Sequence, residues 1–174
     1  MDYVLDPELA ALAPAIPRVD LSDVAATREA ERHMAADLPV YESQAELCVQ
    51  DVAIPHRQGG GEVPVRVYAP AGRSSALPGL LYVHGGAFVT GGLFSVDFGA
   101  RMLADRADVA VVTVDYRLAP EHPYPAGLED SYAALEWAAG KGGEYGIDMT
   151  AAAPAWPPSS WTRRRSTTGS TPRR

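Results

Sequence analysis

The sequence predicts an α/β fold with right-handed crossovers. Two short runs, 80–83 and 109–114, are apolar apart from Thr113, which is typical of strands that are covered on both faces. A stretch with helical spacing of apolar residues follows each run, and two alternating runs precede them. Because strands and helices that alternate in this order pair in parallel through right-handed crossovers, the pattern indicates an α/β domain that begins with a hairpin.

Composition and charge narrow the class of protein. The chain has 174 residues, 47% of them hydrophobic, and a single cysteine. These values suffice for a buried core and exclude both a disordered chain and a disulfide scaffold. Residues 1–150 hold all 22 acidic residues and 10 of the 15 basic ones, a net charge of −12. Such a surface repels phosphate backbones, so we expect no nucleic-acid partner.

The N-terminus and the hydropathy favour a cytoplasmic protein. Asp2, Asp6 and Glu8 occupy the region in which a signal peptide carries basic residues. The longest strongly apolar run, 109–114, is far shorter than the roughly 18 residues that span a bilayer. We therefore expect neither export nor a membrane partner.

Residues 1–46 form a segment that is rich in Ala, Leu and acidic side chains and is interrupted by four prolines. Between these prolines, Val24 and Arg28 recur at helical spacing, with Asp20 or Ser22 as alternative N-caps. The segment therefore predicts one or two short helices.

A β-hairpin is expected after this segment. Residues 47–54 and 63–68 alternate between apolar and polar side chains, and the connection 56–61 contains three consecutive glycines. Cys48 lies in the first alternating run. There we expect it to be a buried small hydrophobe rather than a reactive thiol.

The first helix of the sheet domain is expected between the two continuously apolar runs. Ser95 is its predicted N-cap, because a serine hydroxyl accepts a hydrogen bond from the first helical turn. Phe98, Met102 and Leu103 follow at helical spacing and are predicted to form its apolar face.

A loop and a second helix follow the second apolar run. Residues 116–125 contain three prolines, which predicts a loop. In the next segment Leu128, Tyr132 and Leu135 share one helical face, and Gly140 is a plausible C-terminal stop.

One motif with chemical potential lies at the end of the first apolar run. His84, Gly85, Gly86 and Ala87 follow the predicted strand at its carboxyl end, where open α/β sheets bind their ligands. Two successive glycines allow a tight turn whose amide N–H groups can stabilise the oxyanion of an acyl-transfer reaction. On these residues alone, a simple glycine turn is the better interpretation, and an oxyanion-binding turn is the alternative.

A second motif makes the oxyanion-binding turn the better interpretation. Residues 115–126 read Asp-Tyr-Arg-Leu-Ala-Pro-Glu-His-Pro-Tyr-Pro-Ala and begin about thirty residues after the first motif. With both motifs in this order, the chain resembles the hormone-sensitive-lipase-like branch of the α/β-hydrolase carboxylesterases over residues 47–148. The resemblance implies an α/β-hydrolase fold whose N-terminal helices correspond to the family's cap segment. It also implies an esterase or lipase that hydrolyses small or medium-chain acyl esters through a serine acyl-enzyme, without a metal or cofactor.

The resemblance assigns different roles to the residues of the two motifs. The N–H groups of Gly86 and Ala87 correspond to donors of the oxyanion hole, although many family members have Gly at the second of these positions. His84 takes a structural role rather than that of the catalytic base. The motif positions that support the loop without reacting are His84, Gly85, Asp115, Tyr116, Arg117 and Glu121.

The catalytic triad of the family is not identified in this sequence. An α/β-hydrolase places its nucleophile in a Gly-x-Ser-x-Gly turn, followed along the chain by Asp or Glu and then His. None of the ten serines lies in that pattern, and no histidine follows His122. We therefore expect the N-terminal half of the fold, truncated before the nucleophile-elbow strand and inactive. A non-catalytic ligand-binding or interaction protein on the same scaffold is the alternative.

Residues 151–174 differ from the rest of the chain. They contain no Val, Ile, Leu, Met, Phe or Tyr and carry five Arg, a net charge of +5. Fourteen Arg against one Lys, with no Asn, indicate a GC-rich gene, so we interpret this tail as disordered and as a product of out-of-frame translation. The expected organisation is a cap-like segment over 1–46, a partial hydrolase core over 47–150 and this tail.

Truncation at that point has a predicted physical consequence. The strand that contains 80–83 would border the missing elbow strand, so its apolar edge would be exposed. We expect self-association through this edge, alongside a small-molecule ester as the partner that the family implies.

Overall fold

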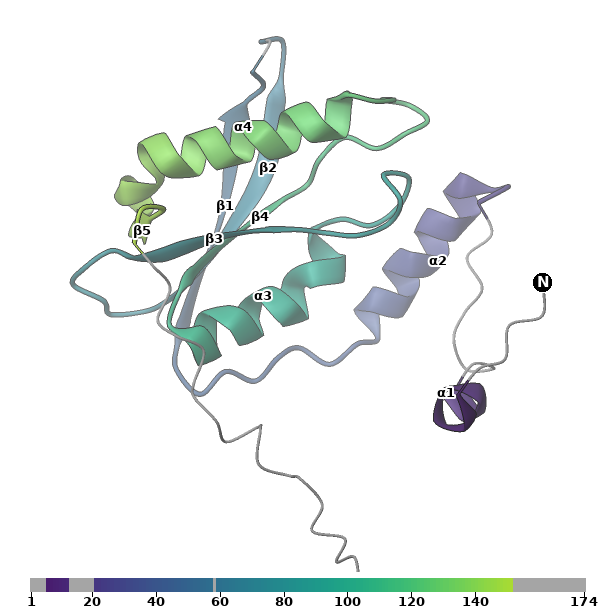
Figure 1. Ribbon diagram of the computed structural model, residues 1–174, viewed down its shortest axis with the longest axis horizontal. Coiled ribbons are helices and arrows are strands. Elements are labelled where there is room, and N and C mark those ends of the chain that lie inside the picture. Colours follow the sequence, from purple (N-terminus) through teal and green to yellow (C-terminus); the bar gives the residue numbers. More distant parts are fainter. Residues whose placement is uncertain (1–5, 13–20, 58, 152–174) are drawn as a thin grey trace, which may run out of the picture.

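The computed structural model describes residues 6–12, 21–57 and 59–151, which form a five-stranded mixed sheet with helices on both faces (Figure 1). In chain order, the strands are β1 (Leu47–Pro55), β2 (Glu62–Pro70), β3 (Leu77–Val83), β4 (Ala110–Val114) and β5 (Ile147–Asp148). The strand order across the sheet is β1-β2-β4-β3-β5. β1, β2 and β4 pair antiparallel, whereas β3 pairs parallel with β4 and with β5. The predicted α/β class and the hairpin are confirmed.

The helices follow the predicted order. They are α1 (Pro7–Leu12), α2 (Val24–Ala36), α3 (Leu93–Ala107), α4 (Ala126–Lys141) and the 3-10 helix η2 (Gly142–Tyr145). Figure 1 shows α3 and α4 on opposite faces of the sheet, with α2 beside the loops that leave β3 and β4. None of the helices in the described ranges is long and apolar enough to cross a membrane.

β4 forms the centre of the core. All five of its residues are buried, as the continuous apolar run predicts. Val112 and Val114 belong to the hydrophobic cluster that packs beneath α4, whereas Val111 belongs to the cluster beneath α3. Alternate side chains of one strand thus fill both halves of the core.

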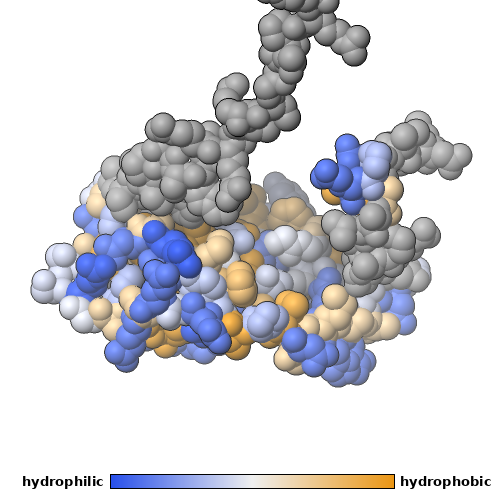
Figure 2. Space-filling model, turned by 90° about the horizontal axis from the view of Figure 1, so that it is seen from below, coloured by the Kyte–Doolittle hydropathy of each residue, from blue (hydrophilic) through white to orange (hydrophobic). Residues whose placement is uncertain are grey.

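The apolar faces predicted for the two helices are largely wrong, and of the three residues predicted for α3 only Leu103 packs against the core. In α3, Phe98 and Met102 are exposed, and the buried side is made by Val96, Ala100 and Ala104. Small residues allow a helix to approach a sheet closely, so the Ala positions face the sheet and the larger side chains lie at the sides of the helix. Seen from the side on which α3 lies, hydrophobic surface is visible among hydrophilic side chains (Figure 2).

The same correction applies to α4. Leu128, Tyr132 and Leu135 are exposed. The buried side of this helix is made by one carboxylate, Asp130, and four small residues. The small residues are Gly127, Ala133, Ala134 and Ala138.

The predicted helix ends differ from the observed ones by one to three residues. α2 begins after Asp23, whose side chain accepts a hydrogen bond from Ala26 N–H at 2.9 Å, and not after Asp20 or Ser22. Ser95 lies inside the first turn of α3, where its hydroxyl donates to the Gly92 carbonyl oxygen at 2.6 Å.

Two further corrections concern α4 and the hairpin. α4 continues through Gly140 to Lys141 and is capped by Gly142. Cys48 is exposed rather than buried. β1 is an edge strand of the sheet. Its residues Leu47 and Val49 pack against the core, so Cys48 between them lies on the opposite face of the strand.

β3 is only partly covered, contrary to the expectation of a strand buried on both faces. Leu80 is 39% exposed and Val83 is 40% exposed. β5 pairs only with Leu77 and Pro78 of β3. Within the described ranges, no strand pairs with 79–83 on the side away from β4. The predicted open edge is therefore present in the described part of the chain, while residues 152–174 of the predicted tail lie outside it.

Candidate active site

The first motif forms a tight loop at the carboxyl end of β3. Residues 85–92, here called the glycine loop, connect β3 to α3. The backbone angle φ is positive at three consecutive residues, with 127° at Gly86, 53° at Ala87 and 62° at Phe88. Left-handed backbone is uncommon for residues other than glycine, so two of these three residues adopt a strained conformation.

The turn leaves two neighbouring amides without an acceptor. The N–H groups of Val89 and Thr90 both donate to the carbonyl oxygen of Gly86 at 2.9 Å, and a Cβ atom at Gly86 would overlap the Thr90 carbonyl. Within the part of the chain that the structure describes, the N–H groups of Gly86 and Ala87 donate no hydrogen bond to another residue. Adjacent unpaired donors at the end of a strand are what an oxyanion requires.

His84 anchors the base of the glycine loop. It is 4% exposed, its Nδ1 lies 2.8 Å from the Gly85 carbonyl oxygen, and its ring stacks on Tyr116 with a centroid distance of 4.1 Å. The Tyr116 hydroxyl donates to the His84 carbonyl oxygen at 3.0 Å. Nε2 of His84 is buried and has no hydrogen-bond partner within the described residues. These contacts support a structural role for His84 rather than that of a general base.

The second motif continues from β4 into the loop beside the glycine loop. Burial raises the pKa of the Asp115 carboxyl, and a hydrogen bond from the Leu93 N–H opposes this rise. Burial likewise raises the pKa of the Tyr116 hydroxyl. Asp115 thus holds the first turn of α3, and Tyr116 supports His84.

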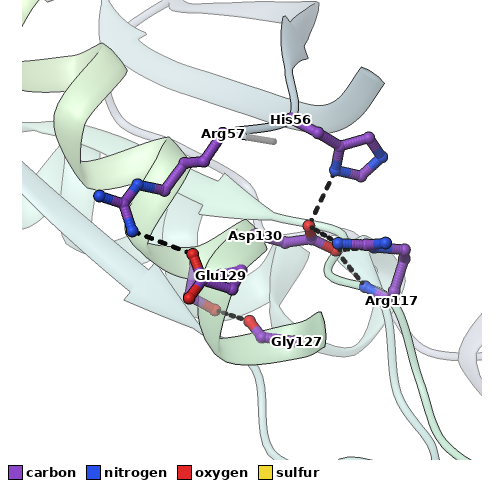
Figure 3. A network of polar contacts seen from close by, with 7 residues as sticks. His56, Arg57, Arg117, Gly127, Glu129 and Asp130 are labelled. Atoms are coloured by element: carbon purple, nitrogen blue, oxygen red, sulfur yellow. Dashed lines mark hydrogen bonds and ion pairs between the residues drawn. The ribbon is translucent and has the colours of Figure 1, made fainter. Parts of the chain in front are cut away.

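Arg117 takes part in a polar network with Asp130 of α4 and His56 (Figure 3). Its guanidinium donates to both carboxylate oxygens of Asp130, at 2.9 and 2.8 Å, and its backbone N–H donates to the same group at 2.9 Å. His56 Nδ1 lies 2.9 Å from Oδ1 of this carboxylate, the oxygen that also accepts from Arg117 Nη2. Burial alone would raise the pKa of the Asp130 carboxyl, but the hydrogen bonds from Arg117 outweigh burial and lower it.

Glu121 is held by α2. Arg28 donates to both of its carboxylate oxygens, at 2.8 and 3.0 Å, and this hydrogen bonding lowers the pKa of the Glu121 carboxyl. The motif positions are therefore divided between two assemblies. His84 and Tyr116 lie under the glycine loop, whereas Arg117 and Glu121 tie the second loop to α4 and α2.

The sequence patterns assigned no role in these loops to four residues that organise them. Asp130 and His56 form the network beneath α4, and Arg28 and Glu31 connect α2 to the glycine loop. The sequence does contain a signal for Asp130, because it is the one charged residue among the small residues that share the buried face of α4. The remaining three contacts join segments far apart in the chain, so no local pattern indicates them.

Two serines of the described helices bond to backbone carbonyl oxygens of their own helices. The hydroxyl of Ser95 donates to the Gly92 carbonyl oxygen, and that of Ser131 donates to the Gly127 carbonyl oxygen at 2.8 Å. Neither serine is paired with a histidine. Over the same residues, no group of three or more His, Cys, Asp or Glu side chains is arranged to hold a metal ion.

A cleft of about 440 Å³ opens beside the glycine loop, between α2 and the start of α3. Gly85 and Gly86 form part of its wall. Its apolar lining comes from both helices and β3, and includes Met34, Leu38, Tyr82, Phe94 and Val96. An apolar cleft with unpaired amides at its edge suits a small ligand that carries a carbonyl group.

Comparison with known proteins gives a consistent result. Residues 80–153 match a family described as alpha/beta hydrolase fold. Esterase LipI of Mycobacterium tuberculosis is 42% identical over 148 residues, which are 83% of this chain and 45% of LipI. Carboxylesterase NlhH of the same species is 52% identical over 87 residues, covering 50% of this chain and 27% of NlhH.

A solved structure shows the same similarity in three dimensions. The bacterial heroin esterase matches with a TM-score of 0.73 and 35% identity, over 83% of this chain and 45% of that protein. The chain thus spans less than half the length of these relatives. Motif order, sheet topology and these matches agree that the chain has the N-terminal portion of an α/β-hydrolase fold and is similar over it to esterases such as LipI and NlhH.

Proposed function

We propose that this chain carries the oxyanion-binding part of a serine carboxylesterase site. The observation that carries the proposal is the pair of unpaired amides, Gly86 and Ala87, at the carboxyl end of β3. Such donors stabilise the negative charge that develops on a carbonyl oxygen during acyl transfer, and a single donor contributes about 3 kcal/mol to lowering the barrier. The esterases LipI and NlhH support the same reaction class.

The proposed substrates are small carboxylic esters. The cleft beside the glycine loop has a volume of about 440 Å³, and its walls are mainly apolar. This suits an acyl chain of small or medium length whose carbonyl oxygen lies against the amides of Gly86 and Ala87. Among the described residues that line the cleft, Glu31 alone is charged, which favours an uncharged substrate.

We further propose that the chain by itself does not turn over esters. No serine lies in a Gly-x-Ser-x-Gly turn, and no histidine follows His122 to act as the base. The oxyanion site would therefore bind a carbonyl group without attacking it. An assay with p-nitrophenyl butyrate is expected to show no saturable hydrolysis, and saturable activity that persists through purification would contradict this.

Binding is tested separately from turnover. In the ¹⁵N-labelled chain, titration with ethyl butyrate is expected to shift the amide resonances of Gly86 and Ala87 progressively. Gly86→Ala should abolish these shifts, because its Cβ atom would overlap the Thr90 carbonyl. Shifts confined to other parts of the chain would overturn the assignment of the oxyanion site.

A further inference from the structure

We propose that Arg28 and Glu31 of α2 are positioning residues that hold the glycine loop in its oxyanion-binding conformation. This inference rests on the proposed function, because it concerns the same loop. Both residues lie in the N-terminal segment, some sixty residues before the loop in the sequence. They reach the loop from the side, as α2 lies against it.

The glycine loop requires external support. Ala87 and Phe88 both have positive φ angles, at 53° and 62°. Strained backbone of this kind persists only where the surrounding structure holds it in place. Within the loop, the hydrogen bonds from Val89 and Thr90 to Gly86 close the turn, and Ala119 N–H donates to the Phe88 carbonyl oxygen at 2.9 Å.

Arg28 adds a bond to the next carbonyl of the loop. Its Nε donates to the Val89 carbonyl oxygen at 2.8 Å, and its Nη2 donates to the Ala119 carbonyl oxygen at 2.6 Å. Together with its two hydrogen bonds to Glu121, one guanidinium joins the glycine loop to the loop after β4. The Arg28 side chain is only 18% exposed, so its charge-assisted bonds to the Val89 and Ala119 carbonyl oxygens are partly shielded from water, whereas Glu121 is 56% exposed.

Glu31 holds the loop one turn further along α2. Its carboxylate accepts a hydrogen bond from the Gly91 N–H at 3.1 Å. Gly91 has a φ of 94°, and a Cβ atom there would overlap the His84 ring. Arg28 and Glu31 therefore fix the loop at two points, one at Val89 and one beside the buried histidine.

The position of α2 depends on the same bonds. The helix contains no buried residue, so apolar burial contributes little to holding it on the sheet domain. Its polar contacts to Val89, Gly91, Ala119 and Glu121 are correspondingly important. Displacement of α2 and loss of the loop conformation are thus expected to occur together, which links the cap-like segment to the oxyanion site.

Amide hydrogen exchange of the full chain tests the proposal without any ligand. The reporters are the amides of Val89 and Thr90, because both are protected by the loop's own hydrogen bonds to Gly86. In Arg28→Ala, their exchange is expected to accelerate about tenfold or more, while the amides of β4 keep their rates. Arg28→Lys retains the charge but cannot reach all acceptors at once, so an intermediate acceleration is expected.

Two matched variants complete the test. Arg57→Ala removes an arginine with two carboxylate partners, Glu129 and Glu136, that does not touch the loop, and it should leave Val89 and Thr90 unchanged. Glu31→Ala should accelerate exchange at Gly91, whereas Glu31→Gln keeps an acceptor oxygen and should restore most of the protection.

The outcomes separate this proposal from the proposed function. Unchanged loop exchange in Arg28→Ala, or equal acceleration at β4, would overturn the positioning role. If Arg28→Ala does not fold, the Arg28→Lys and Glu31 variants give the same decision. Accelerated exchange combined with no ethyl butyrate shifts in the unmodified chain would uphold the positioning role and reject the oxyanion site.

Discussion

At the scale of single residues, Ala87 connects sequence to function most directly. Ala87 has a φ of 53°, a left-handed backbone conformation that favours glycine. Alanine at such an angle is less favourable than glycine, although glycine has a greater entropic cost on folding. The loop with alanine at this position is therefore expected to be less stable than the same loop with glycine.

Replacing Ala87 with Gly should relieve the backbone strain. We expect the free energy of unfolding to rise by about 0.5 to 1 kcal/mol, measured by urea denaturation. The control is Ala139→Gly on the exposed side of α4, where the same substitution should lower it by about 1 kcal/mol. Equal destabilisation by both variants would show that position 87 is not strained.

Asp130 is a buried carboxylate whose charge is expected to stabilise the folded state. It is 1% exposed and accepts hydrogen bonds from Arg117, while His56 lies against it. Asp130→Asn should lower the free energy of unfolding by about 2 to 3 kcal/mol at pH 7, because Arg117 loses its carboxylate. Glu129→Gln, which affects the more exposed pair with Arg57, should cost less than about 1 kcal/mol.

The pH dependence of this contribution follows from the lowered pKa of Asp130. A carboxyl whose pKa is lower in the folded state contributes its full stabilisation above the unfolded value of about 3.9, and loses it as the pH falls further. The difference in stability between the unmodified chain and Asp130→Asn should therefore be constant from pH 7 to 5 and shrink below about pH 4. A difference that stays constant down to pH 3 would contradict the lowered pKa.

At the scale of elements, the sequence predicted the types and order of helices and strands better than their faces. The hairpin, β4 and the loop after it were predicted correctly because alternation, continuous apolar character and proline are local signals. The predicted faces of α3 and α4 differ from the observed ones because hydropathy favours large apolar residues for burial, whereas most buried positions of these helices are small. In the structure, Ala100 and Ala134 face the sheet, since a close helix–sheet approach selects small side chains.

The assignment of the α4 face can be tested by substitution. Leu128 is 52% exposed, so Leu128→Gln should change the free energy of unfolding by no more than about 0.5 kcal/mol. Ala134 is fully buried against the sheet, so Ala134→Leu should cost about 1 to 3 kcal/mol through overpacking. Urea denaturation of both variants decides the question, and a larger loss for Leu128→Gln would restore the face predicted from the sequence.

At the scale of the whole molecule, the two motifs predicted the family, and a small part of the site followed from them. The positions of Gly86, Ala87 and the support from His84 and Tyr116 could be expected, because they lie within or beside the motifs. The contacts of Arg28 and Glu31 could not, since they depend on where α2 lies against the sheet domain. Long-range packing of a polar helix leaves no periodic signal in the sequence.

The open side of β3 gives the prediction that concerns the molecule as a whole. Unpaired strand edges associate with one another, and Leu80 and Val83 add apolar surface at this one. We expect sedimentation velocity to show an average mass that rises with concentration. Leu80→Lys should shift the chain toward the monomer, because a charged side chain at an edge opposes pairing.

Val40→Lys is the matched control for this edge. Val40 is more exposed, at 67%, but it precedes β1 and is not part of β3. If the edge mediates association, this variant should sediment like the unmodified chain although it adds the same charge. Equal dissociation by Val40→Lys would assign the effect to net charge, and a chain that stays monomeric at all concentrations would show that β3 does not pair with a second copy.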